Sequence, residues 1–290
     1  VRKLRRIRSL AVEKGLRRRE EKPFSKIGVD EKQVFARHKY LTVICDQEAK
    51  SVYDVIDSRK TGNVSPWFAD NEALRHDVGT AAMDMSAGYA SVVRNNLPNA
   101  AICFDKFHVA QTMNQAVDLT RREEQRKLPE EQRKLMFGSR FCFLHAQENL
   151  PEKYKDKFEE VASVAVKTSK AWAIKEALWA LLSLDLPDLE AAFRKWHWWA
   201  THSRLEHVKK AAKTLKDHFY GIMNAVEYGI TNALCEGLNS KIEAIKRAAC
   251  GYRSKSRFQS GGTIPLRKTR PDAKTYHLTP KKCRSANLIM

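Results

Sequence analysis

The sequence lacks any hydrophobic run approaching the roughly 20 residues that a membrane-spanning helix requires. Its N-terminus is basic, but no apolar stretch follows, so no secretory signal peptide is predicted. Its six cysteines form no Cys-x-x-Cys pair and no regular disulfide framework. That pattern argues against a structural zinc site and favours a reducing compartment. We therefore expect a cytoplasmic protein with no membrane partner.

Acidic residues are scarce at both ends of the chain. Residues 1–22 hold 10 basic and 3 acidic residues, and residues 246–290 hold 12 basic and 1 acidic. The two ends supply 18 of the 19 net positive charges, whereas residues 23–245 are almost neutral. Basic ends on a neutral body are typical of contact with a phosphate backbone. Two solvated tails are the alternative interpretation.

The first part of the chain predicts a helix followed by three strands. Apolar residues at helical spacing indicate a basic helix in residues 1–22. The period then changes to two, and a short alternating run ends at Asp30. Residues 40–45 and 51–56 are rich in β-branched and aromatic residues and predict an antiparallel hairpin. Gly62 and Pro66 are predicted to lie in the loop that follows.

A strand–helix–strand pattern comes next. Residues 78–83 predict a strand ending at Asp84, residues 87–95 a helix, and residues 100–104 a strand ending at Asp105. A unit of this length favours a parallel pair with a right-handed crossover. Hairpin strands followed by such a unit give the order of an RNase H-like mixed sheet. We therefore predict an α/β fold, although many other folds also begin with hairpins.

The pattern from about Phe107 to Glu227 is helical throughout, and most of the tryptophans fall within it. These are Trp172, Trp179, Trp196, Trp198 and Trp199. They could form a surface that stacks on nucleic-acid bases. Tryptophan at helical spacing is more often the core of a helical bundle, so the bundle interpretation is favoured.

The last predicted helix covers residues 231–250. One apolar stripe runs along it: Leu234, Leu238, Ile242, Ile245 and Ala249. Glu236 projects from the opposite face, which it shares with Asn232, Asn239 and Glu243. After Gly251 the periodicity ends, and the remainder reads as a flexible basic tail.

Asp30, Asp84 and Glu236 together are a candidate metal site. Hydrolysis of a phosphodiester needs an activated oxygen and stabilisation of the leaving oxygen, and two Mg²⁺ ions about 3.5–4 Å apart supply both. Mg²⁺ prefers hard oxygen ligands, which carboxylates provide. Strand ends place acids rigidly, and a helix packed on the sheet can add a third. Each acid also has an ordinary explanation, as a turn residue, a helix cap or a solvated side chain.

Two neighbouring features are ambiguous from residue types alone. Asp105 and His108 form an Asp-x-x-His pair that could orient a metal-bound water or contact DNA. A capping aspartate beside a partly buried histidine is an equally good interpretation. Because side chains alternate along a strand, Glu31 should point away from the metals, while Lys32 could reach a phosphate.

At this point four stretches resemble the bacterial insertion-sequence transposases of the ISL-three type, which have a DDE catalytic core. They are IGVDEKQVFARHKYLTVICD, MDMSAGYASVVRNNLPNAAICFDKFHVAQTMNQAVDLTRREEQ, FGSRFCFL and ITNALCEGLNSKIEAIKRAACGYR. They occur in family order across roughly residues 5–253. No single stretch is specific, but together they are.

The resemblance implies a catalytic triad of Asp30, Asp84 and Glu236 that binds two Mg²⁺ or Mn²⁺ ions. It implies supporting roles for Asp105, His108 and Asn239. Basic groups would hold phosphates: Lys32, Lys246, Arg247 and Arg253. The substrate would be double-stranded DNA, both element ends and target. The protein would be a nucleoid-associated homo-oligomer that cuts the element's ends and joins them to target DNA.

The implied organisation has five parts. They are a basic helical lead-in (1–22), the first part of an RNase H-like core (23–109), a large all-helical insertion between the second Asp and the Glu (110–228), the Glu-bearing helix (229–252) and a basic flexible tail (253–290). The family's N-terminal cysteine motif and helix-turn-helix are not found, and the tail is atypical. We therefore expect an N-terminally truncated chain.

Two rival functions follow from that expectation. The chain could be an inactive remnant of a transposase that binds DNA without cutting it. It could also be an RNase H-like nuclease that nicks DNA without joining strands. Metal-dependent cleavage separates the first rival from an active transposase, and a strand-transfer product separates the second.

Overall fold

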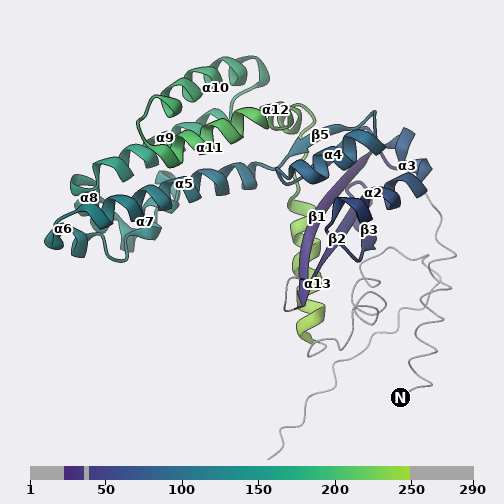
Figure 1. Cartoon of the computed structure of the whole chain (residues 1–290), viewed down its shortest axis with the longest axis horizontal. Helices are drawn as coiled ribbons and strands as arrows, with labels where there is room; N and C mark the ends of the chain where they lie inside the picture. The colour runs from purple at the N-terminus through teal and green to yellow at the C-terminus, as the bar shows by residue number, and fades with distance from the viewer. Residues whose placement is uncertain (1–22, 36–38, 249–290) are drawn as a thin grey trace, which may run out of the picture. The chain divides into compact units, whose positions relative to one another are not determined.

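The structure is a computed structural model that describes residues 23–35 and 39–248. The chain packs into two units (Figure 1). Of the described residues, the first unit contains 23–35, 39–79, 94–99 and 233–248, and the second contains 80–93 and 100–232. The predicted lead-in and the predicted tail, with Arg253, lie outside the described residues.

The first unit is built on an antiparallel sheet of three strands. They are β1 (Lys26–Phe35), β2 (Lys39–Asp46) and β3 (Ser51–Ile56). β2 pairs with both of the others. The turn between β2 and β3 is closed by Asp46, whose Oδ1 accepts hydrogen bonds from the backbone N–H groups of Glu48 and Ala49. The predicted hairpin is confirmed, as is the antiparallel order.

The sequence analysis predicted that the first strand ends at Asp30, and that prediction is wrong. Asp30 is the fifth of ten residues in β1. The strand continues because β2 supplies backbone partners both before and after Asp30. Asp30 lies opposite Val43, and Lys32 lies opposite Leu41. Backbone pairing outweighs the low strand propensity of the charged residues there.

The predicted loop at Gly62 and Pro66 is also wrong. Both residues lie in α2 (Thr61–Asp70), which α3 (Glu72–Asp77) follows. Val64 and Phe68, one turn apart, are both buried and fix α2 against the unit. Burial of this stripe outweighs the cost of a proline within the helix.

Helix α13 (Ala233–Ala248) completes the first unit and lies along the sheet (Figure 1). Its buried side chains join alternating residues of β2 and β3 in one apolar cluster: Leu41, Val43, Cys45, Val52, Val55, Cys235, Leu238 and Ile242. Because alternate residues share one face of a strand, α13 covers the Leu41–Val43–Cys45 face. The helix predicted to start at residue 231 is confirmed, and its observed start at Ala233 differs by two residues.

The second unit opens with β4 (Thr80–Met83), most of α4 (Ala87–Asn96) and β5 (Ala101–Phe104). β4 and β5 are parallel, with Met83 opposite Phe104. The predicted strand–helix–strand pattern is therefore confirmed. Asp84 and Asp105 follow directly after these paired strands, so both stand at the same carboxyl edge.

The rest of the second unit is helical. Its helices are α5 (Lys106–Lys127), α6 (Glu130–Leu135), α7 (Arg140–Leu144), α8 (Lys155–Val164), α9 (Val166–Leu181), α10 (Leu186–Thr201), α11 (Glu206–Asp217) and α12 (Phe219–Glu227), with 3₁₀ turns η1 (Gln147–Asn149) and η2 (Glu152–Tyr154). The long α5 packs against α9 and α11 (Figure 1). The described strands and helices together make an α/β protein with both antiparallel and parallel pairing.

The tryptophans do not all form bundle core. Trp196 is buried, and its indole N–H donates to the carbonyl of Ile174. Trp179, Trp198 and Trp199 are exposed. The core interpretation therefore holds for Trp196 and is wrong for these three.

Helix α12 packs so closely on β5 that Gly221 has no room for a side chain. A Cβ there would overlap the buried ring of Phe104. We expect Gly221→Ala to destabilise the protein by about 1–3 kcal/mol, because the ring or the helix must shift. The free energy of unfolding from urea titration measures this.

Gly237 is the matched control, because it is also helical but has no atom within 4 Å of a Cβ. Gly237→Ala should stabilise the fold by up to about 1 kcal/mol through helix propensity alone. Equal effects of the two substitutions would contradict the tight contact at Gly221.

Candidate functional site

Asp30 and Asn239 form a polar contact between β1 and α13. The Nδ2 of Asn239 donates a hydrogen bond of 2.7 Å to Oδ2 of Asp30, across 209 positions of sequence. Oδ1 of Asp30 accepts from the backbone N–H of Glu31. Asn239 is 7% exposed, so the contact is largely shielded from water. Asp30 therefore lies on the face of the sheet that α13 covers.

Glu236 lies one helical turn before Asn239 on α13. Residues three apart on a helix have Cβ atoms about 5–6 Å from each other on the same side. Glu236 is therefore on the side of α13 that carries the contact to Asp30, and it is half-buried. Two of the three predicted acids thus come from facing elements of one unit.

Lys32 lies two residues beyond Asp30, on the same face of β1. It forms an ion pair of 3.5 Å with Glu243 of α13. Lys246 approaches the same carboxylate at 3.3 Å. Lys32 and Lys246, which were both predicted to bind phosphate, therefore share the carboxylate of Glu243. The sequence analysis did not predict this arrangement. Arg247 is exposed.

Glu31 points to the other face, as alternation predicted. Its carboxylate lies 3.6 Å from the guanidinium of Arg59. Side chains alternate along β1, so the neighbouring acids Asp30 and Glu31 have different partners on opposite faces.

Asp84 stands at the edge of the parallel pair in the second unit. Its Oδ1 accepts a hydrogen bond of 3.2 Å from the backbone N–H of Ser86 at the start of α4. Burial raises the pKa of the Asp84 carboxyl above its ordinary value, and His108 and the Ser86 N–H partly oppose that shift. Asp84 is therefore a half-buried carboxyl group at the carboxyl edge of the parallel pair, with Oδ1 bonded to the turn that leads into α4.

Asp105 has a structural role in this arrangement. Its Oδ1 accepts from the N–H of Phe107 and caps α5. Its Oδ2 accepts from the N–H of Asn232, immediately before α13 begins. Both carboxylate oxygens are therefore engaged, so the capping interpretation is confirmed. His108 is half-buried in the first turn of α5, with Nδ1 3.3 Å from Oε1 of Gln111.

Two buried asparagines near these acids have unpaired atoms. Oδ1 of Asn239 and both amide atoms of Asn232 have no hydrogen-bond partner. Such groups are costly unless a water, ion or ligand satisfies them. Oδ1 of Asn239 belongs to the amide that holds Asp30.

No group of three or more His, Cys, Asp or Glu side chains lies at metal-binding distance within residues 23–35 and 39–248. Cys45, Cys103, Cys142 and Cys235 are buried. In the same described ranges, no helix is both long and apolar enough to cross a bilayer.

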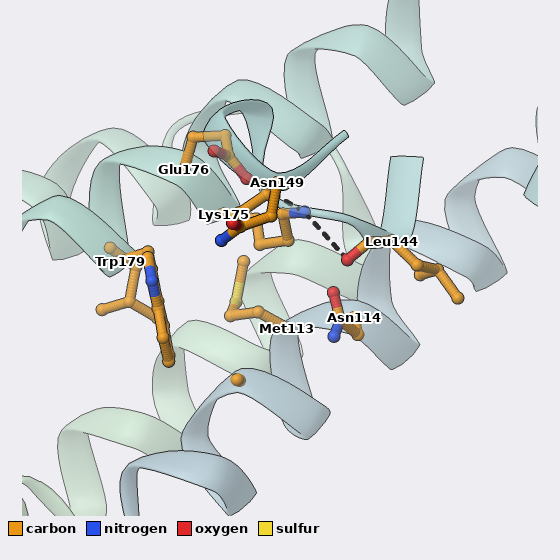
Figure 2. A pocket seen from close by; sticks show the side chains of 10 residues that line it. Met113, Asn114, Leu144, Asn149, Lys175, Glu176 and Trp179 are labelled. Atoms are coloured by element: carbon orange, nitrogen blue, oxygen red, sulfur yellow. Dashed lines mark hydrogen bonds and ion pairs between the residues drawn. The ribbon is translucent and has the colours of Figure 1, made fainter. Parts of the chain in front are cut away.

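A cavity of about 180 Å³ lies between α5 and α9 in the second unit (Figure 2). Lys175 is one of the residues that line it. Its ammonium donates to the carbonyls of Phe143, Leu144 and His145 at the end of α7. It also lies 3.0 Å from the carboxylate of Glu176. Burial lowers the pKa of Lys175, and Glu176 opposes that shift. The lysine is thus committed to structure, and no predicted site residue lines the cavity.

A family model described as transposase, that of the ISL3-type DDE enzymes, matches residues 27–261. This chain belongs to the ISL3-type transposase family. The matched region contains Asp30, Asp84 and Glu236 and most of both units. The resemblance drawn from the four motifs is confirmed.

Two curated relatives are similar over most of the chain. The transposase for insertion sequence element IS1557 of Mycobacterium tuberculosis (strain H37Rv) is 25% identical over 280 residues, 88% of this chain and 63% of the relative. The transposase for IS1001 of Bordetella parapertussis is 24% identical over 237 residues, 80% of this chain and 58% of the relative. The chain thus spans less than two thirds of their length. No solved structure matches it.

Proposed function

We propose that this transposase-family chain cuts DNA at the ends of an insertion element and joins the ends to target DNA. Asp30, Asp84 and Glu236 supply the carboxylates, in an RNase H-like core with a helical insertion. The observation that carries the proposal is the hydrogen bond from Asn239 to Asp30, because it ties β1 to the helix that bears Glu236. Family membership supplies the reaction class.

The chemistry of these side chains suits a divalent cation such as Mg²⁺ or Mn²⁺. All three acids provide hard oxygen ligands, and Oδ1 of Asn239 is a buried oxygen with no partner. Two such ions would supply an activated attacking oxygen and stabilise the leaving oxygen of the phosphodiester. Asn239 orients Asp30 through its hydrogen bond to Oδ2. Asp105 holds the backbone at Asn232, directly before the helix that bears Glu236 begins.

Duplex DNA is the proposed substrate, and the basic groups are its proposed contacts. Lys32 and Lys246 would exchange their shared partner Glu243 for phosphate. Arg247 is exposed and available for the same role. Phosphate contacts of this kind position the duplex without reading its sequence. A homo-oligomer bound near the nucleoid is part of the same proposal.

The decisive experiment incubates the full chain with a supercoiled plasmid that carries the element's ends, with Mg²⁺ or with EDTA. We expect cleavage at the ends only with the metal, followed by joined products when target DNA is added. Binding without cleavage under every metal condition would favour the inactive remnant. Nicks without joined products would favour a simple nuclease.

A further inference from the structure

Helix α10 presents a row of tryptophans away from the bundle. Trp198 is 64% exposed and Trp199 is 37% exposed, although Trp196 on the same helix is buried. The indole N–H of Trp196 donates to the Ile174 carbonyl and anchors α10 to α9. Phe193 stacks on Phe219 at 3.9 Å and anchors it to α12. The exposed rings therefore project from a helix that is fixed in place.

The exposed face of α10 is cationic as well as aromatic. Arg194, Lys195 and His202 are exposed and lie on the same side as Trp198 and Trp199 at 100° per residue. The carboxylates of α10, Asp188 and Glu190, lie near its beginning. No acidic residue occurs from Ala191 to His202. We name these five residues the α10 face: Arg194, Lys195, Trp198, Trp199 and His202.

Trp198 is held in a defined orientation by His202. The two rings stack with centroids 4.5 Å apart and planes 22° apart. Nδ1 of His202 lies 2.8 Å from the carbonyl oxygen of Trp198. A carbonyl only accepts, so Nδ1 carries the hydrogen in this contact. An exposed tryptophan held in this way loses little side-chain entropy when a ligand stacks on it.

A shallow apolar groove of about 460 Å³ adjoins the α10 face. Trp199 and Lys195 form its α10 side, and Leu181 and Leu184 line it from α9 and the turn that follows. Leu184 is 40% exposed. A flat apolar group can thus stack on an exposed tryptophan ring or lie in the adjacent groove. A cationic side chain lies beside each of these two places.

We propose that the α10 face binds unpaired bases of single-stranded DNA. This rests on the proposed function, which makes DNA the polyanion that the chain meets. Bases that have left the stack present a flat ring to Trp198 or Trp199, and Arg194 and Lys195 neutralise the flanking phosphates. Aromatic platforms with flanking cations bind single strands in this way, without sequence readout. A paired duplex hides its base faces, so it engages only the cations.

The test measures binding of the full chain in EDTA, so it is independent of cleavage. The probes are an oligothymidylate of about 12 nucleotides and an abasic strand with the same phosphates. We expect tighter binding to the oligothymidylate. Trp198→Ala should weaken it about tenfold while changing abasic binding little, since stacking contributes only to the first. Trp198→Phe should retain most of the affinity.

Two further variants separate the contributions. Arg194→Ala with Lys195→Ala should weaken binding to both probes. Phe137→Ala removes another exposed aromatic ring, 79% exposed and outside α10, and should change neither. Melting temperatures confirm that each variant is folded. If Trp198→Ala removed only self-association in sedimentation, the face would be a protein interface and the proposal would be overturned.

Unchanged oligothymidylate binding by a folded Trp198→Ala protein would equally overturn it. Failure of the proposed function has another signature, namely the absence of metal-dependent cleavage at element ends. A chain that binds the oligothymidylate through Trp198 but never cuts DNA would retain the α10 face as a DNA surface and lose the catalytic assignment.

Discussion

Replacing Asp84 with asparagine is expected to abolish metal-dependent cleavage while raising the melting temperature of the metal-free protein at pH 7. Loss of a metal ligand removes several kcal/mol of transition-state stabilisation, so the rate should fall on the order of 1,000-fold. Stability should rise because burial disfavours the charged carboxylate. Asparagine keeps an oxygen that can accept from Ser86. A variant that fails to fold would instead lower both the cleavage rate and the melting temperature.

The stability part has a defined pH dependence. The pKa of Asp84 is raised in the folded state, so its contribution to stability is fully present below the unfolded pKa. It is lost as the pH rises through the folded pKa. The gain from Asp84→Asn should therefore be largest at neutral pH and vanish as the pH falls below 3.8, the carboxyl's ordinary value. Thermal melts across that range measure it.

Glu159→Gln is the matched control for charge removal, because Glu159 is an exposed carboxylate on α8. It should leave both cleavage and melting temperature nearly unchanged. Asp30→Asn and Glu236→Gln should abolish cleavage as Asp84→Asn does. Full metal-dependent activity in any of the three would remove that residue from the proposed site.

Local pattern was sufficient for much of the first unit and for the start of the second. Alternation and β-branched content predicted the hairpin of β2 and β3. The parallel pair followed from the spacing of two apolar runs around a helix. These signals are local, because each element's own residues determine which side is buried.

Features that depend on a distant partner were not predictable. Asp30 looked like a strand end because charged residues follow it, yet β2 pairs with the chain as far as Phe35. Lys32 is tolerated in that strand because Glu243, more than 200 positions away, accepts its charge. Pro66 lies inside a helix because Phe68 and Val64 are buried by the rest of the unit.

The tryptophans show the limit of periodicity in another way. Trp196 and Trp198 are two residues apart, so they must face different sides of α10. The sequence cannot say which side the bundle covers. Contacts of Phe193 and Trp196 with other helices decide it, and leave Trp198 outside.

Asn239 is expected to control the metal affinity of the site through Asp30. Asn239→Ala removes the donor that fixes Oδ2 of Asp30 and also removes the unpaired Oδ1. Loss of such an orienting residue typically weakens metal binding 10- to 100-fold. The Mg²⁺ concentration for half-maximal cleavage should rise by about that factor. Activity at saturating Mg²⁺ should recover much more than in Glu236→Gln, because the carboxylate ligands remain.

Calorimetric titration with Mn²⁺ gives a reading that does not depend on catalysis, and it should show the same loss of affinity. Ser240→Ala is the control, since Ser240 is the next residue on α13 and is exposed. It should leave the metal midpoint unchanged. If Asn239→Ala shifted the midpoint no more than Ser240→Ala did, its hydrogen bond would serve only to pack α13 on β1. Asp30 would then need another residue to orient it for a cation.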